Sequence, residues 1–158
     1  MKVGIVGAGG IGARRARIAA GTPDVIVAAV ADILADRARK VAEPLGAAVF
    51  TDWRAIVDAP DIDVVIVSAS NDLHAAVSVA AMEAGKDVLC EKPLARTPAE
   101  ARRIHDEAVR TGRTLKTGFN HRHYGSVLKS REIADSGELG APQEMKASVA
   151  RVANAANR

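Results

Sequence analysis

Four glycines near the amino terminus have the spacing of a phosphate-binding loop. Residues 7–12 read Gly-Ala-Gly-Gly-Ile-Gly, a G-x-G-x-x-G pattern that also includes Gly10 and Ile11. Gly7 allows a tight turn, Gly9 lets the backbone approach a pyrophosphate because it has no Cβ, and Gly12 lets a following helix pack close to a sheet. The free N–H groups and the dipole at the start of that helix attract phosphates. The loop therefore predicts dinucleotide binding, and the alternative is a flexible glycine-rich loop.

An acidic residue stands where a dinucleotide site needs one. Asp32 ends the second predicted strand, 25 residues after Gly7. At that strand tip, a carboxylate accepts hydrogen bonds from the adenosine ribose hydroxyls. The same charge repels a 2′-phosphate, which favours NAD, although Arg37 and Arg39 nearby weaken that preference and keep NADP open. The alternative for Asp32 is a solvated turn residue.

Polar residues also follow three later strands. The first cluster runs from Ala69 to His74 and includes Asn71, the second is Glu91-Lys92-Pro93, and the third runs from Phe119 to Arg122. In a parallel sheet these clusters converge on one crevice beyond the strand ends. Lys92 follows an apolar strand into that crevice, so partial desolvation would lower its pKa and suit it to proton transfer. An exposed lysine at the start of a loop is the alternative.

Pro93 and His74 are each open to more than one interpretation. Pro93 stiffens the turn and is a candidate for a cis peptide bond. His74, in the first turn of a helix, is as well explained by capping or packing as by ligand contact.

Strands that alternate with helices predict an α/β fold with a doubly wound parallel sheet. The strands are apolar throughout rather than alternating, which indicates a sheet covered on both faces. The predicted strands are Lys2–Val6, Val25–Val30, Ala47–Phe50, Ile62–Ser68, Asp87–Cys90 and Thr114–Gly118. The predicted helices are Ala13–Ala20, Ala35–Leu45, Trp53–Asp58, Asn71–Ala84, Pro98–Thr111 with Thr97 as its cap, and Ser126–Ser136.

Composition narrows the classes of partner. The net charge of +3 comes from mixed charges rather than a basic stripe, so neither nucleic acid nor membrane is an expected partner, and a small anionic ligand fits better. Arg14, Arg15 and Arg17 could contact nucleic acid, but a solvated helix face explains them better. Cys90 is the only cysteine, which excludes an internal disulfide and indicates a reducing, cytoplasmic location. No set of metal ligands is expected.

Taken in order, the motifs resemble the amino-terminal half of the glucose–fructose oxidoreductase, inositol dehydrogenase and rhizopine-catabolism family (Gfo/Idh/MocA). The resemblance extends from Val3 to about Pro142. It rests on GIVGAGGIG (4–12), AVAD (29–32), SNDLH (70–74), VLCEKPLA (88–95) and GFNHRHYGSVLKSREIADSGELG (118–140). Glu-Lys-Pro after the fifth strand is its most diagnostic part.

The resemblance implies a Rossmann fold and an NAD(P)-dependent oxidoreductase acting on a sugar, cyclitol or related polyol. It implies that Gly7 to Gly12 bind the pyrophosphate and Asp32 the adenosine ribose, and that Ala69, Asn71 and His74 line the cofactor cleft. Glu91 and Lys92 would lie at the nicotinamide ribose and ring, with Lys92 catalytic. A non-catalytic dinucleotide-binding module, such as a sensor or assembly partner, is the alternative.

The chain is shorter than the members of this family. Its members are about twice as long, and their second, α+β half covers the nicotinamide and binds substrate. We therefore expect a Rossmann domain over residues 1–122, and over residues 123–158 a crossover helix and the truncated start of the second domain. The tail from Ala147 to Arg158 is expected to fray. Such a chain would bind NAD but turn substrate over poorly, and its exposed apolar surface could drive homo-oligomerisation.

Overall fold

The computed structural model describes residues 1–141. The chain divides into two compact units, the first spanning Met1–Phe119 and the second beginning at Asn120. The tail from Ala147 to Arg158 lies outside the described residues, so the expectation that it frays stays an expectation.

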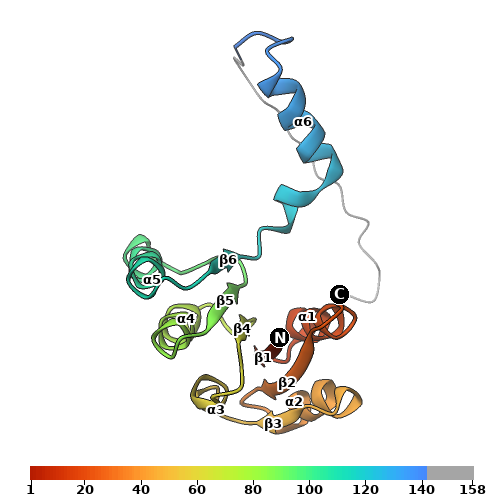
Figure 1. Ribbon diagram of the computed structural model, residues 1–158, viewed down its shortest axis with the longest axis vertical. Coiled ribbons are helices and arrows are strands. Elements are labelled where there is room, and N and C mark those ends of the chain that lie inside the picture. Colours follow the sequence, from red (N-terminus) through yellow and green to blue (C-terminus); the bar gives the residue numbers. More distant parts are fainter. Residues whose placement is uncertain (142–158) are drawn as a thin grey trace, which may run out of the picture. The chain divides into compact units, whose positions relative to one another are not determined.

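The first unit is built on a six-stranded sheet in which all neighbouring strands are parallel. The strand order is β3-β2-β1-β4-β5-β6, the order of a Rossmann fold, which confirms the predicted doubly wound sheet (Figure 1). The order reverses between β1 and β4, and ligands bind beyond the carboxyl ends at such a reversal. The strands are β1 (Lys2–Val6), β2 (Ile26–Ala31), β3 (Ala48–Phe50), β4 (Val64–Val67), β5 (Asp87–Cys90) and β6 (Leu115–Thr117).

Helices cover both faces of this sheet (Figure 1). Ile5 and Val30 pack with Ala16 of α1 and Ala38 of α2 on one face. On the other face Val65 and Val67 pack with residues of α3, α4 and α5. Alanines on α1 and α2 let these helices approach the strands closely, as an aromatic-poor chain requires. The helices are α1 (Gly10–Ala20), α2 (Ala35–Ala42), α3 (Arg54–Asp58), α4 (His74–Glu83) and α5 (Pro98–Thr111).

The strands end in register, and this alignment positions the residues that follow them. Val6 pairs with both Ala31 and Val67, and Cys90 pairs with both Val67 and Thr117. One residue further along, a last row of backbone N–H groups donates to the neighbouring strand. These bonds run from Gly7 to Ala31 (2.8 Å), Asp32 to Phe50 (3.1 Å), Ser68 to Val6 (2.7 Å), Glu91 to Val67 (2.9 Å) and Gly118 to Cys90 (2.8 Å).

Some helix ends differ from the prediction for local reasons. Helix α1 begins at Gly10 rather than Ala13, because Gly9 acts as the N-cap and the last three residues of the loop already form the first turn. Helix α4 begins at His74 rather than Asn71, because a turn closed by the Leu73 N–H and the Ser70 carbonyl (2.9 Å) precedes it.

The predicted end of α2 is wrong, whereas both predicted ends of α5 are correct. Helix α2 stops at Ala42, and residues Glu43–Leu45 form a 3-10 turn that contains Pro44, which lacks the N–H that a helix needs. Helix α5 has the predicted bounds, and the Thr97 hydroxyl accepts from the Glu100 N–H at 3.2 Å.

The second unit contains a 3-10 turn (Asn120–His123) and helix α6 (Gly125–Asp135), close to the predicted Ser126–Ser136. The rings of His121 and Tyr124 lie 4.9 Å apart. Among residues 1–141, no helix combines the length and apolar character needed to cross a bilayer.

Candidate functional site

The glycines of the loop divide into two kinds. Gly7 has a φ of 92°, and a Cβ there would lie 2.5 Å from the Ala69 nitrogen, while a Cβ on Gly12 would collide with the Gly7 carbonyl oxygen. A Cβ on Gly9 or Gly10 would meet nothing within 4 Å. Gly7 and Gly12 are therefore required by the fold, whereas Gly9 and Gly10 face open space.

The open space lies at the amino end of α1. The first helical hydrogen bond runs from the Ala13 N–H to the Gly9 carbonyl at 2.9 Å, so the N–H groups of Gly10, Ile11 and Gly12 precede the intrahelical bonding. The first turn contains no acidic residue, so the positive end of the helix dipole is not offset there. This arrangement fits a pyrophosphate.

Asp32 is fixed beside this loop. Its Oδ2 accepts from the Ala8 N–H at 2.8 Å, and its Oδ1 accepts from the Leu34 N–H at 2.9 Å. A carboxylate has about four acceptor positions, so these two bonds leave capacity for the two hydroxyls of a ribose. A rigid carboxylate next to the phosphate-binding amides is what adenosine recognition requires.

A hollow of about 180 Å³ adjoins Asp32. Its walls combine the apolar side chains of Ile33, Trp53 and Leu73 with the guanidinium of Arg37. An aromatic base fits such walls, and the neighbouring carboxylate would meet the sugar. Ala69, Ser70 and Thr51 also line it.

The loop after β4 contains three of the predicted site residues. Ala69 lies against Gly7 and lines the hollow, and Asn71 lies exposed in the turn before α4. The His74 ring is 1% exposed. Its Nδ1 lies 2.7 Å from the Pro93 carbonyl oxygen and its Nε2 lies 3.2 Å from that of Ala69. These contacts favour the packing interpretation, in which His74 ties the β4 loop to the turn after β5.

That turn carries Glu91, Lys92 and Pro93. The Lys92–Pro93 peptide bond is cis. The expected desolvation of Lys92 is wrong, because its side chain is exposed: only Glu91 turns inward, and Lys92 already lies two residues beyond the strand. Lys92 therefore presents a solvated ammonium at the carboxyl edge of the sheet.

Glu91 is held by Arg15, a residue that was not predicted to belong to the site. Arg15 of α1 donates from Nε to Glu91 Oε1 at 2.7 Å, and its Nη2 contacts the same oxygen. The expectation of a solvated face is wrong for Arg15, whose side chain is only 17% exposed. Gly12 and Ala16 are buried, and Arg15 lies three residues after the first on the same helix face. That spacing was the signal that could have identified it.

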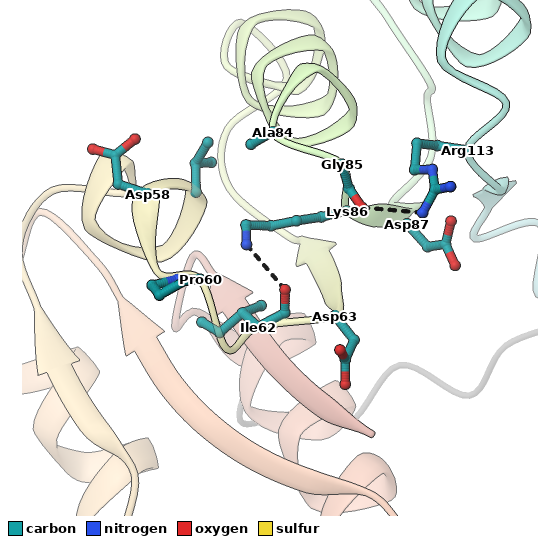
Figure 2. A pocket seen from close by; sticks show the side chains of 10 residues that line it. Asp58, Pro60, Ile62, Asp63, Ala84, Gly85, Lys86, Asp87 and Arg113 are labelled. Atoms are coloured by element: carbon teal, nitrogen blue, oxygen red, sulfur yellow. Dashed lines mark hydrogen bonds between the residues drawn. The ribbon is translucent and has the colours of Figure 1, made fainter.

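A second hollow, of about 690 Å³, lies at the opposite edge of the sheet (Figure 2). Figure 2 shows Lys86 reaching toward the Ile62 carbonyl, to which its Nζ donates at 2.9 Å. The same Nζ also donates to the Ala59 carbonyl at 2.6 Å. Burial lowers the pKa of Lys86, while the charges of Asp61, Asp63 and Asp58 oppose that shift. This lysine serves the fold, and the hollow lies away from the strand ends where ligands bind.

The part of the chain that carries this site is similar to known proteins. Residues 1–119 match the model of an oxidoreductase family with an NAD-binding Rossmann fold, the Gfo/Idh/MocA family. The chain belongs to this family. The glycine loop, Asp32 and the Glu91–Lys92–Pro93 turn all lie within the matched residues, so this family's cofactor, NAD, is the ligand that the loop and the Asp32 hollow fit.

Individual members of the Gfo/Idh/MocA family align with most of the chain. Inositol 2-dehydrogenase of Salmonella typhimurium is 40% identical over 146 residues, which cover 90% of this chain and 44% of the relative. A crystal structure of an NAD binding oxidoreductase from Klebsiella pneumoniae superposes with a TM-score of 0.78 at 34% identity, over 89% of this chain and 40% of that one. Levoglucosan dehydrogenase in complex with NADH gives 0.79 at 32% identity, with coverages of 89% and 40%. The chain therefore spans less than half the length of these relatives.

Proposed function

We propose that this chain is the cofactor-binding part of an NAD-dependent oxidoreductase that acts on a carbinol carbon of a cyclitol, sugar or related polyol. The carrying observation is the Asp32 carboxylate, which bonds to the Ala8 N–H beside the open amino end of α1. One ligand with a diphosphate and a ribose satisfies both features. The relatives named for inositol and levoglucosan support the polyol class.

The proposed roles of the chain's residues follow from their positions. The N–H groups of Gly10 to Gly12 would bind the pyrophosphate, and Asp32 would orient the adenosine ribose. NAD supplies the hydride acceptor when it is bound. Lys92 would assist loss of the hydroxyl proton to solvent, because its ammonium would donate a hydrogen bond to the carbinol oxygen and its positive charge would stabilise the developing alkoxide.

NAD is the expected cofactor rather than NADP. Arg39 bonds to Asp36 at 2.7 Å, whereas Arg37 lines the Asp32 hollow, so only Arg37 is placed to offset the repulsion of a 2′-phosphate. The repulsion between the Asp32 carboxylate and the 2′-phosphate of NADP therefore sets the preference for NAD. This argument supports NAD and leaves NADP as the weaker ligand.

Calorimetric titration of the purified chain with NADH and with NADPH tests the proposal. Saturable NADH binding with weaker NADPH binding is expected. Asp32→Asn removes the charge but keeps the shape, so it should shift the preference toward NADPH by about fivefold or more, since two charges about 4 Å apart interact by at least about 1 kcal/mol. A wild-type chain that binds neither nucleotide contradicts the proposal.

The catalytic role of Lys92 has its own test. Where polyol-dependent reduction of NAD is measured, Lys92→Ala should abolish it and leave the NADH dissociation constant nearly unchanged. Activity that survives this substitution refutes the catalytic role of Lys92.

The proposed location is the cytoplasm. Cys90 is a free, buried thiol and the only cysteine, which agrees with a reducing compartment.

A further inference from the structure

Three elements that are distant in sequence meet at the Glu91 carboxylate. Arg15 approaches it from α1, 76 residues earlier in the chain. The Lys92 N–H donates to its second oxygen, Oε2, at 3.3 Å. Gly118, just after β6, faces it from a third direction, since a Cβ there would lie 2.9 Å from both carboxylate oxygens. The carboxylate therefore joins the phosphate-binding helix to the turn that carries Lys92.

Stability alone does not explain this ion pair. The side chains of Arg15 and Glu91 are 17% and 8% exposed, so both charges lose most of their hydration. The cost of that desolvation offsets much of the attraction, and apolar residues of similar size often stabilise a fold as well. What an ion pair adds is fixed geometry, because the guanidinium donates in a rigid plane.

We propose that Arg15 is a positioning residue, which acts through Glu91 to hold the 91–93 turn so that Lys92 lies over the nicotinamide end of a dinucleotide bound at α1. The inference rests on the proposed function, in which Lys92 is the catalytic group. The same helix then serves two purposes. Its amino end binds the pyrophosphate, and its second turn sets the distance from that pyrophosphate to the Lys92 turn.

Protection of Lys92 from acetylation by NADH measures this placement directly. Lys92 is exposed, so an amine-reactive acetylating reagent reaches it in the free protein. With NADH at about ten times its dissociation constant, about one molecule in ten is free, so labelling of a covered Lys92 falls about tenfold. Mass spectrometry of the Lys92 peptide gives the ratio of the rates with and without NADH. Lys116 and Lys129 serve as internal references.

Arg15→Gln should still bind NADH but lose the protection, so that the ratio of labelling rates without and with NADH falls from about ten to about one. Each protein is measured at the same multiple of its own NADH dissociation constant. Gly118→Ala displaces the same carboxylate from the other side and should reduce the protection as well. Arg14→Gln, one residue away on the exposed face of α1, should retain the wild-type ratio. A variant that is merely less stable, but still folded and saturated with NADH, would keep the wild-type ratio of labelling rates.

The outcomes separate the two proposals. If the wild type binds NADH but Lys92 is not protected, or if Arg15→Gln and Gly118→Ala keep full protection, the positioning role of Arg15 is wrong and NAD binding stands. If the wild type does not bind NADH in the same titration, the proposed function fails and this inference fails with it. If Arg15→Gln does not fold, Gly118→Ala decides.

Discussion

The glycines of the loop have different roles, and single substitutions distinguish a glycine that faces a ligand from one that the fold requires. Gly9→Ala places its Cβ in open space, so the free energy of unfolding should fall by no more than about 1 kcal/mol, the cost of exchanging an N-cap glycine. The same methyl occupies the side from which a pyrophosphate approaches, so NADH affinity should fall by at least about tenfold. Urea unfolding and NADH titration measure the two effects.

Gly12→Ala is the matched contrast. Its Cβ would collide with the Gly7 carbonyl, a backbone atom that cannot move away easily, so this variant should lose at least about 1–3 kcal/mol of stability. Equal effects of the two substitutions on stability would show that Gly9 is not reserved for a ligand.

Trp53 offers a spectroscopic report on the hollow beside Asp32. It is the only tryptophan, it lines that hollow, and the Arg54 guanidinium lies 4.6 Å from its ring centre. ADP-ribose and AMP should therefore change the Trp53 emission on binding, because the adenine would lie against the indole. Nicotinamide mononucleotide, which lacks adenine, should leave the emission unchanged. A response to the mononucleotide alone would place the adenosine elsewhere.

Between elements, backbone register decides what a sequence reveals about the site. The strands were predictable because each is a short apolar run between turn residues, and parallel pairing then aligns Gly7, Asp32 and Glu91 at one edge. The tie between Arg15 and Glu91 was not predictable in the same way. It joins residues 76 positions apart: the spacing from Gly12 and Ala16 places Arg15 toward the buried side of the helix, but no local pattern identifies Glu91 as its partner.

Lys86 is a second case in which local pattern misleads. It stands in a Gly-Lys-Asp turn that looks solvated, but the residue is 4% exposed and joins the segment after α3 to the segment after α4. Only the bonds between these two segments in the folded chain show that it is buried.

Lys86→Met should destabilise the fold by about 1–3 kcal/mol. It fills similar space but leaves the Ile62 carbonyl without the ammonium that it accepts from, and a buried carbonyl without a donor costs about that much. Arg113→Met is the control, because Arg113 lines the same hollow but its bond to the Gly85 carbonyl (3.1 Å) is exposed (Figure 2). It should change stability by no more than about 0.5 kcal/mol. Equal losses in urea unfolding would refute the structural role of Lys86.

At the scale of the whole molecule, the first unit has the parts that nucleotide binding needs. It ends at Phe119, and the family match ends at residue 119. Its sheet is covered on both faces by its own helices, and every residue proposed to bind NAD lies within it. Binding and stability are therefore properties that this unit should show in the 158-residue chain.

The stability of this unit should fall in mild alkali because of one buried thiol. Burial raises the pKa of Cys90 from 9.0 to about 11, and the charge of Glu91 adds to the shift. In the unfolded chain the thiol ionises near its ordinary pKa, so between pH 9.0 and about 11 the folded state holds a proton that the unfolded state has lost. Its contribution is complete below that range and lost above it, and it amounts to at most about 2–3 kcal/mol.

Urea unfolding of wild type and Cys90→Ala across this range tests the effect. The variant should be less stable at neutral pH, because a small cavity replaces the sulfur, but its stability should fall less steeply with rising pH. All other titrating groups are common to both proteins, so the difference in slope isolates the thiol. Parallel curves would mean that Cys90 ionises at the same pH in the folded and unfolded chain, and that the end of β5 is open to water.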